Sequence, residues 1–425
     1  MVSMTLDYFL KMIKDSLSSS GAYIRLLILL IILINDSWAQ ILPSSFGAHH
    51  KKNASTVNYA LSFDGSNDYI STGGSNISTA WTVEVWFKKS SNKSGHNFTN
   101  KANSGNTSTW SLRLAQWKNM NKVGITKYGD KDYYINNSKA NLEIDKWEHV
   151  AWTYQSNTVT VYVNGENLGS TFKAYAYNGN QSLPSNAILY WKIIGKSSNS
   201  IGGEIDEMRI WNDKRTSDEI NDNMFISLDG NESNLVAYYK MSDGSGNSLT
   251  DNSTNSNIGT LVNGPTWVTS NAPIGSINSS YRTNIEALWE KTGTSDSEPS
   301  DGLSMNVSSA LAETNFVVYG NNGSAGTDDS DFPSGESIQK RSSRIWCFDE
   351  KGTVTSDIKI DISSATGNSV TPSSASNYKL LYKSCTSCSF SVYATGASNS
   401  GDVVTFSNIT IQDGFYAIAT TDTNL

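Results

Sequence analysis

An acidic segment in the middle of the chain carries the residue types that glycoside hydrolysis uses. It reads GGEIDEM over residues 202–208, with carboxylates at Glu204, Asp206 and Glu207. Retaining glycosidases need two carboxyl groups facing one sugar, a nucleophile and an acid/base. Side chains of a strand alternate between its faces, so residues 204, 206 and 208 point together, and residue 208 is Met208. Glu207 then points the other way unless a β-bulge realigns it, so we expect no catalytic residues here.

Cysteine chemistry is confined to three residues, Cys347, Cys385 and Cys388. An odd count leaves one thiol unpaired. Cys385 and Cys388 form a C-x-x-C pattern between expected strands, and because it opens no helix it does not indicate a thioredoxin-like motif. Two pairings stay open: a loop-closing bond between these two, or a bond from Cys347 to one of them. A zinc site is not expected, because no histidine lies nearby and four ligands are usual.

The elements that position such side chains are expected to be strands. Residues 146–165, KWEHVAWTYQSNTVTVYVNG, alternate apolar and polar residues twice, and this period of two indicates strands with one buried face. A polar Gln-Ser-Asn break separates the two strands. The second strand ends in Asn164-Gly165, the dipeptide that best tolerates the positive φ angles of a type I′ turn. The sequence therefore predicts an antiparallel sheet rich in aromatic residues.

The composition favours a β protein and argues against nucleic acid as a partner. Charged residues make up only 17% of the chain, and Asn, Ser, Thr and Gly are abundant, as in proteins of short strands and polar turns. The formal net charge of -8 argues against a nucleic-acid partner, which requires a basic surface. There are 12 tryptophans and 20 tyrosines, and we expect most of them to fill cores.

The N-terminus predicts export. Residues 26–34, LLILLIILI, are an unbroken apolar run that follows basic residues and precedes Ser37-Trp38-Ala39. This is the outline of a secretory signal peptide over residues 1–39, cleaved after Ala39. The alternative is a membrane anchor, but the run is about half of the ~20 residues that span a bilayer. We expect no membrane span after signal cleavage and an extracellular location, secreted or at the cell surface.

The remainder divides into two expected β domains. Residues 40–57 read as a polar linker, residues 58–271 as the first domain and residues 276–425 as the second. Residues 272–275, Ala-Pro-Ile-Gly, combine proline and glycine and are expected to form the hinge.

One helix is expected within the first domain. Thr216 begins a Ser/Thr-x-x-Glu pattern that ends at Glu219, and Ile220, Met224 and Ile226 follow it. In a capping box the Thr side chain accepts a hydrogen bond from the backbone N–H of the third helical residue, and the Glu side chain accepts one from the Thr backbone N–H. We therefore expect Thr216 to cap a short helix with Glu219 as its reciprocal partner.

Five motifs occur in an order that resembles a known family. They are FDGSNDYI, WTVEVWFK, KWEHVAWTYQSNTVTVYVNG, GGEIDEMRIWNDKRTSDEI and NLVAYYKMSDGSGNSLTDNS, and they span about half of the chain. Their types and order are similar to the LamG-like jelly-roll domain of the concanavalin A-like lectin and glucanase superfamily. The resemblance implies a sandwich of two antiparallel sheets.

The second domain has a weaker resemblance. Arg344-Ile345-Trp346, followed by GTVTSDIKIDIS and YKLLY, is similar to a domain of unassigned function that often follows LamG-like modules in bacterial surface proteins. That domain usually carries an aspartate-rich stretch after its LL strand, and CTSC stands there in this chain. The expected fold class is therefore all-β, a concanavalin A-like jelly roll followed by a smaller β-sandwich.

The resemblance also implies a structural cation. In the family, an aspartate of the GEIDE strand and the FDG aspartate approach a structural cation, which carries over to Asp206 and Asp64, with Asn67 beside them. Calcium takes six to eight oxygen ligands, including backbone carbonyls. The alternative is that Asp64 only stabilises its own turn through a local hydrogen bond. Both interpretations stay open, so calcium is an expectation with Asp64, Asn67 and Asp206 as its ligands.

Sugar recognition would use aromatic rings beside polar groups on an exposed surface. Seven aromatic residues lie in or beside polar loops, and the segment AYAYNGN, residues 174–180, is the most loop-like. The ligand-binding candidates retained from this set are Trp110, Trp117, Tyr175, Tyr177 and Trp191.

These observations predict a non-catalytic binding or adhesion protein that recognises a glycan, or another matrix or cell-surface ligand, through loops of the jelly roll. The function rests on the resemblance, because one fold hosts many functions. Two alternatives are a glycan-degrading enzyme of the same superfamily, which would need an intact carboxylate pair, and a structural spacer in a surface assembly.

Overall fold

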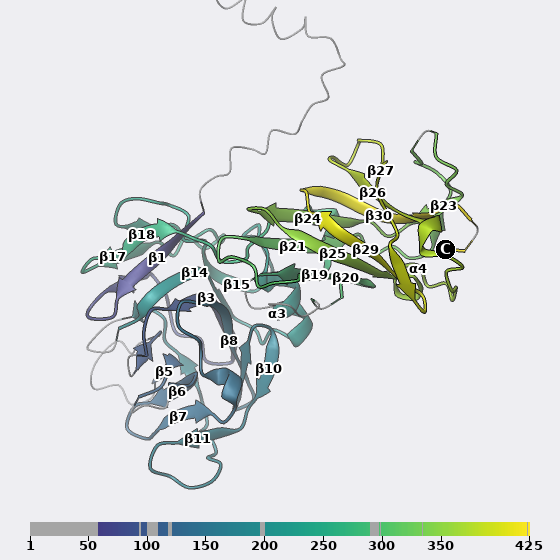
Figure 1. Cartoon of the computed structure of the whole chain (residues 1–425). Coiled ribbons are helices and arrows are strands. Elements are labelled where there is room, and N and C mark those ends of the chain that lie inside the picture. Colours follow the sequence, from purple (N-terminus) through teal and green to yellow (C-terminus); the bar gives the residue numbers. More distant parts are fainter. Residues whose placement is uncertain are drawn as a thin grey trace, which may run out of the picture. The chain divides into compact units, whose positions relative to one another are not determined.

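The computed structural model describes residues 58–425, apart from 93–94, 100–108, 118–120, 196–199, 290–296, 298, 334 and 423. The regular secondary structure of this part of the chain consists almost entirely of strands (Figure 1). Its two α-helices are short, α3 at Ser217–Met224 and α4 at Ile362–Thr366, and within it no helix has the length and apolar character to cross a bilayer. The predicted all-β class is confirmed. The predicted signal peptide and linker lie outside the described residues.

The first domain is organised around one large antiparallel sheet. Its strand order is β10-β9-β8-β3-β14-β1-β18, and β15 pairs with β14. The strands are β1 Tyr59–Asp64, β3 Ala80–Lys89, β8 Trp147–Gln155, β9 Thr158–Val163, β10 Glu166–Gly169, β14 Gly202–Trp211, β15 Leu235–Tyr239 and β18 Thr266–Thr269. The pairing of β8 with β9 is the hairpin that the alternating segment predicts.

Smaller sheets form the second layer of this domain. One has the order β11-β7-β6-β5-β12 with β4 beside β5, and the other has the order β13-β2-β17-β16. The strands are β2 Tyr69–Ser71, β4 His96–Asn97, β5 Thr109–Ala115, β6 Gly124–Lys127, β7 Asp132–Ile135, β11 Phe172–Ala174, β12 Ile188–Leu189, β13 Ile193–Gly195, β16 Ser248–Leu249 and β17 Gly259–Val262. A single core unites Val83 and Trp152 of the large sheet with Leu112 and Ile125 of the six-stranded sheet. The domain is therefore a sandwich.

The hairpin turns have the backbone that their sequences predict. Asn164 and Gly165 have φ angles of 50° and 77°, as a type I′ turn requires. A Cβ atom on Gly165 would lie 2.1 Å from the Asn221 side-chain oxygen of α3, so glycine also allows the close approach of the helix. The turn between β8 and β9 has positive φ at Ser156 and Asn157 as well.

Helix α3 covers the outer face of the large sheet. Its N-terminus is the predicted capping box, in which Thr216 accepts a hydrogen bond from the Glu219 backbone N–H and Glu219 accepts one from the Thr216 N–H. Near its other end, the Met224 carbonyl accepts a 2.7 Å hydrogen bond from the indole N–H of Trp86, which lies on the outer face of β3. The capping box confirms the predicted helix.

The second domain also consists of two sheets around a core. The first has the order β19-β21-β24-β30-β23-β22, with β26 pairing to β30 and β27, and the second has the order β20-β25-β29-β28. The strands are β19 Thr283–Leu288, β20 Leu303–Asn306, β21 Phe316–Asn321, β22 Thr327–Asp328, β23 Lys340–Ser342, β24 Trp346–Lys351, β25 Thr355–Asp361, β26 Tyr378–Lys383, β27 Ser391–Thr395, β28 Ser398–Ser400, β29 Val403–Thr410 and β30 Gly414–Thr420. Tyr319 and Trp346 of the first sheet share a core with Ile360 and Phe406 of the second.

The segment expected as a hinge is tightly packed, so that expectation is wrong. Ala272 is buried, and the Gly275 N–H donates a 2.8 Å hydrogen bond to the Phe225 carbonyl. A Cβ atom on Gly275 would lie 2.7 Å from the side chain of Val318. One hydrophobic cluster contains Trp86 of the first domain and Val318 of the second. The described residues accordingly belong to one compact unit.

The cysteines adopt one of the two pairings that the sequence leaves open. Cys385 and Cys388 are joined by a disulfide that closes the loop between β26 and β27. Cys347 is a free thiol in β24, and burial raises the pKa of this thiol to about 11. It is therefore protonated and unreactive at neutral pH.

Candidate functional site

The acidic segment contains the bulge on which its interpretation depends. The register of β14 against β3 shifts between Asp206 and Arg209, and Glu207 has a positive φ of 49°. An extra residue in one strand breaks the alternation of faces. Ile205 and Met208 consequently point into the sandwich core, and Glu207 joins Asp206 and Arg209 on the outer face. The expectation that Glu207 points away from Asp206 is wrong for this reason.

Glu207 is nevertheless closed to a substrate. It is 3% exposed, and its Oε2 accepts a 2.7 Å hydrogen bond from Arg209 and another from the Tyr238 hydroxyl. Arg209 also donates to the backbone carbonyls of Asn223 and Ile226 beside α3. The burial of a charge is tolerated only when it is paired in this way.

A second buried carboxylate lies beside this pair. Glu84 of β3 accepts a 2.9 Å hydrogen bond from the Trp211 indole, and His149 Nε2 lies 3.3 Å from its other oxygen. Burial raises the pKa of Glu84, but His149 and Arg209 outweigh burial and hold the pKa below its usual value. We call Glu84, His149, Asp206, Glu207 and Arg209 the buried acidic face. Its carboxylates contact partners inside the protein and present no open carboxylate pair.

The structure does not bring the predicted calcium ligands together. Asp64 is opposite Gly202 in the sheet, and Asp206 is four residues further along β14, about 13 Å at ~3.3 Å per residue. The Asp206 carboxylate accepts hydrogen bonds from the Ser270 hydroxyl and from the backbone N–H of Glu207. Burial, with Glu207 close by, raises the pKa of Asp206 well above its usual range.

Asp64 makes the turn-stabilising contact that the alternative interpretation describes. Its Oδ1 accepts a 2.7 Å hydrogen bond from the Ser66 N–H, and Asn67 is exposed in the same turn. Asp68, which the motif FDGSND did not single out, is 3% exposed and accepts a 3.0 Å hydrogen bond from the Asp64 N–H. No group of three or more His, Cys, Asp or Glu residues with metal-binding geometry occurs among the described residues. Calcium stays a prediction.

The aromatic candidates separate into buried and exposed rings. Trp110 and Trp191 are 0% exposed in the core of the sandwich, so the prediction that they face a ligand is wrong. Strand β5 turns Trp110 inward, where it stacks on Tyr133, and Trp191 packs directly on the backbone of Gly74. Trp117 is half-buried, with the Arg113 guanidinium 5.6 Å from its ring centre.

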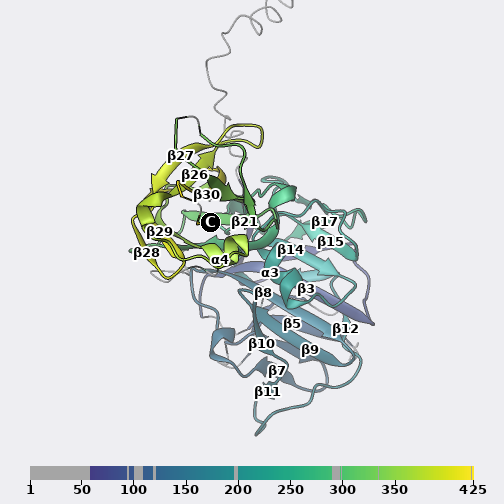
Figure 2. The same ribbon diagram turned by 90° about the vertical axis from the view of Figure 1, so that its right-hand side faces the viewer.

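Tyr175 and Tyr177 are exposed, as predicted. They are 45% and 52% exposed, among the few large apolar side chains in the described residues that reach solvent. They follow β11, at one end of the first domain in both views (Figures 1 and 2). Ala176 between them has a positive φ of 63°, and the Tyr177 N–H donates to the Ala174 carbonyl. We call residues 174–181 the tyrosine loop.

A lysine fixes one ring of the tyrosine loop. The Lys131 ammonium lies 4.3 Å from the centre of the Tyr177 ring and donates a 2.9 Å hydrogen bond to Gln181. The Gln181 side-chain amide in turn donates a hydrogen bond to the Asn178 carbonyl, and the Gln181 backbone N–H donates one to the Phe172 carbonyl. Aromatic rings held in this way present a flat face with little loss of freedom on binding.

A polar groove of about 280 Å³ adjoins the tyrosine loop. Hydroxyl and amide groups line it, including those of Asn157, Thr158, Thr171, Asn180 and Gln181. We call it the polar groove. These residues were not among the predicted ligand-binding residues, and the polar run NGNQS that follows Tyr177 is the sequence signal that points to them. Gln181 belongs to both the groove and the tyrosine loop, so ring faces and hydrogen-bonding groups are contiguous.

Comparison with known families supports the assignment of both domains. Residues 64–221 match the model described as concanavalin A-like lectin/glucanases superfamily. The first domain is of this concanavalin A-like type. Residues 291–415 match a domain of unknown function, DUF8202, which agrees with the weaker resemblance of the second domain. No match is found among the curated proteins.

Several solved structures are similar to this chain at low identity. A proposed carbohydrate-binding protein from Bacteroides ovatus is 23% identical over 52% of this chain and 62% of its own length, with a TM-score of 0.38. Domain 4 of an extracellular arabinanase from Geobacillus stearothermophilus, in complex with arabinotriose, is 18% identical over 38% of this chain and 75% of that domain, with a TM-score of 0.28. This chain thus spans under two thirds of the first structure, and neither similarity identifies a ligand.

Proposed function

We propose that this protein is a glycan-binding protein whose recognition surface is the tyrosine loop together with the polar groove. The observation that carries the proposal is the pair Tyr175 and Tyr177, exposed to 45% and 52% beside a groove lined by hydroxyl and amide groups. Large apolar rings that stay in water at a rigid loop commonly mark a contact surface.

The two parts of this surface suit the two sides of a sugar. The C–H faces of a pyranose ring stack on an aromatic ring, which buries apolar area and gives affinity. The sugar hydroxyls both donate and accept hydrogen bonds, and the Asn180 amide and the hydroxyls of Thr158 and Thr171 in the groove can do the same. Well-placed polar groups beside an apolar platform give orientation and specificity.

We propose that binding occurs without hydrolysis of the glycan. A retaining mechanism needs two carboxyl groups that reach one glycosidic bond. Glu207 is committed to Arg209 and Tyr238, and Glu84 is committed to Trp211 and His149. The lining residues of the polar groove include no carboxylate. These contacts support the non-catalytic part of the proposal.

Two further properties belong to the same proposal. The apolar run at residues 26–34 supports export, so the protein would act outside the cell, secreted or on the surface. Calcium would bind at the Asp64 turn, where Asn67 and Asp68 supply neighbouring oxygens. We expect calcium to raise the thermal midpoint relative to chelator-treated protein, since a ligand that binds only the folded state stabilises it. An unchanged midpoint would contradict calcium binding.

A glycan array tests the proposal on the full chain. We expect retention on at least one glycan by the wild type and loss of that signal in the Tyr175→Ala/Tyr177→Ala variant. Ile258→Ala is the matched control, because Ile258 is 59% exposed on another loop. The control is expected to bind as the wild type does. A wild-type chain that binds no glycan, or a double variant that binds unchanged, would overturn the proposal.

A further inference from the structure

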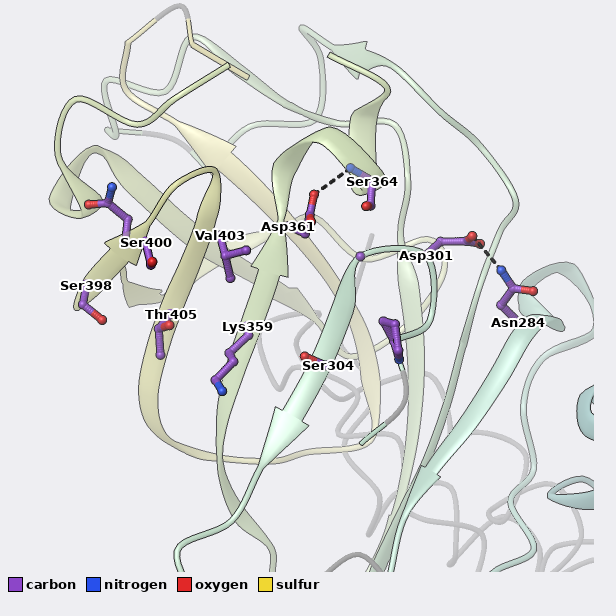
Figure 3. Close-up of a pocket in the computed structure, with 13 residues that line it drawn as sticks. Asn284, Asp301, Ser304, Lys359, Asp361, Ser364, Ser398, Ser400, Val403 and Thr405 are labelled. Carbon is purple, nitrogen blue, oxygen red and sulfur yellow. Dashed lines mark hydrogen bonds between the residues drawn. The ribbon is translucent and has the colours of Figure 1, made fainter. Parts of the chain in front are cut away.

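The second domain contains a cavity that is larger than the polar groove, on the outer face of the sheet β20-β25-β29-β28 (Figure 3). Its volume is about 710 Å³. Alternation along the strands explains its polarity, because Ile358, Ile360 and Phe406 point into the core while the intervening residues point outward. We call it the hydroxyl cavity.

The outward residues form rows that cross the sheet. Ser304, Lys359, Thr405 and Ser398 are in register on four neighbouring strands, so they make one continuous polar row. Figure 3 shows the Lys359 side chain between Thr405 and Ser304. An ammonium group therefore lies in the cavity with a hydroxyl on either side.

A second row places a carboxylate beside that lysine. Asp361 is two residues after Lys359 on β25 and is paired with Val403 of β29. Its Oδ1 accepts a 2.8 Å hydrogen bond from the Ser364 N–H at the start of α4. Burial raises the pKa of Asp361, but the hydrogen bonds from Ser364 and Ser363 outweigh burial and hold its pKa below the usual value. The cavity thus contains an ionised carboxylate.

The wall at the end of these rows is rigid. Asp301 and Gly302 form a turn with positive φ angles of 46° and 96°. The Asp301 carboxylate accepts a 2.6 Å hydrogen bond from the Asn284 side-chain amide and forms an ion pair with Arg344. A Cβ atom on Gly302 would lie 2.8 Å from the Asp361 carbonyl, so the turn packs directly against β25. This wall of the cavity is therefore held by its own contacts.

The charges select the class of ligand. An anionic ligand would meet the carboxylate of Asp361, and a cationic ligand would meet Lys359, whereas the charge of Asp301 is already balanced by Arg344. A neutral polyol meets neither penalty. Its hydroxyls can accept from the Lys359 ammonium, donate to a carboxylate, and do both with serine and threonine hydroxyls.

We propose that the hydroxyl cavity is a second carbohydrate site, which binds a neutral oligosaccharide by hydrogen bonds without an aromatic platform. The proposal does not depend on the tyrosine loop, since different residues in a different domain carry it. Apolar contact is small here, with Val403 and Pro299 in the lining, so this site is expected to bind weakly by itself. A weak second site strengthens attachment to a polymer when both sites can be occupied together.

The test uses the full chain with Tyr175→Ala/Tyr177→Ala, which removes the first proposed site. The probes are neutral hexasaccharides of glucose, mannose, galactose and xylose, with a chondroitin sulfate hexasaccharide as the anionic probe and a chitosan hexamer as the cationic probe. Calorimetric titration is expected to detect at least one neutral probe and neither charged probe.

Variants of the cavity then locate the binding. Thr405→Val is expected to weaken binding about fivefold, the effect of one lost neutral hydrogen bond, and Lys359→Met about tenfold or more, because a hydrogen bond to a charged group contributes more. Ser398→Trp is expected to abolish binding by filling the cavity from an exposed position, and it keeps the test valid if a variant at Lys359 fails to fold. Ser391→Trp, at an exposed position on β27, is the matched control.

The proposal fails if no neutral probe binds to the double tyrosine variant. It also fails if a charged probe binds in preference to the neutral ones, or if Ser398→Trp binds as Ser391→Trp does. Loss of array signal in the tyrosine variant bears on the first site alone. The two proposals therefore stand or fall separately.

Discussion

The buried acidic face and the tyrosine loop belong to the same domain, and both have residue types associated with sugar chemistry. The acidic face lies under α3 and the shared hydrophobic cluster, with Glu84 at 1% exposure and Asp206 at 0%. The tyrosine loop has two rings that are about half exposed. The residue types at both places suggest a role in sugar chemistry, but only the tyrosine loop is exposed to a ligand.

The two regions differ in whether their polar and aromatic side chains are partnered inside the protein or exposed to water. In the acidic face each charge has a partner inside the protein, as Glu207 has with Arg209. Such groups contribute to one stable arrangement, and breaking one pair leaves an uncompensated charge. In the tyrosine loop the two rings are about half exposed to water. Mutations should therefore change stability at the first place and affinity at the second.

The largest expected effect is on stability, at Arg209. Arg209→Met leaves Glu207 buried without its cation, and we expect a loss of about 3–5 kcal/mol in the free energy of unfolding. Urea denaturation at neutral pH measures it. Lys139→Met is the control, since Lys139 pairs with Glu166 and both side chains are exposed, and such pairs contribute about 0.2–1 kcal/mol. Equal effects of the two variants would contradict the role of the buried acidic face.

A smaller loss is expected at the helix that covers the acidic face. Thr216→Ala removes the N-cap of α3, which typically costs about 1 kcal/mol. Thr216→Ser keeps an oxygen in place and should be near wild type in the same denaturation experiment. Glycan binding should be unchanged in both variants, because the helix is not part of the tyrosine loop. Loss of binding without loss of stability would argue against this separation.

The pH dependence of stability should reveal Asp206. Its folded-state pKa is raised by burial, so the native state retains a proton that the unfolded state, with a pKa near 3.8, releases. Stability should consequently fall as pH rises through the window above 3.8. Asp206→Asn cannot lose this proton, so its stability should fall less over the same window. Urea titrations from pH 4 to pH 7 compare the two proteins, and parallel curves would contradict the assignment.

The smallest effect on stability is expected at Lys131. Lys131→Met removes the cation over the Tyr177 ring, and a surface change of this kind stays within about 0.5 kcal/mol. Affinity for the array glycan should fall about two- to fivefold, in line with ~0.5–1 kcal/mol for an exposed cation–π contact. Lys173→Met, on the neighbouring strand β11, is the control in the same titration. A large loss of stability at Lys131 would place it with the buried face instead.

Local patterns in the sequence predicted the local structures well. The Asn164-Gly165 turn and the Thr216 capping box depend on backbone preferences of a few adjacent residues, and both are present. Alternation also predicted the hairpin of β8 and β9. These features need no knowledge of distant contacts.

The wrong predictions concern features that depend on contacts between distant segments. The bulge at Glu207 is visible only in the pairing of β14 with β3, because no local residue type demands it. Trp110 and Trp191 lie beside polar loops in sequence, yet the second layer of the sandwich buries them. The hydroxyl cavity arises from the register of four strands, which a single sequence does not specify.

The most direct test compares the two regions on one glycan identified by the array. Its affinity and the release of reducing ends are measured for the wild type, for Tyr175→Ala/Tyr177→Ala and for Glu204→Gln, which alters the half-buried acid of the GEIDE segment. We predict at least a tenfold loss of affinity in the tyrosine variant, wild-type affinity in Glu204→Gln, and no reducing ends from any protein. Reducing ends released by the wild type and abolished in Glu204→Gln would contradict the account.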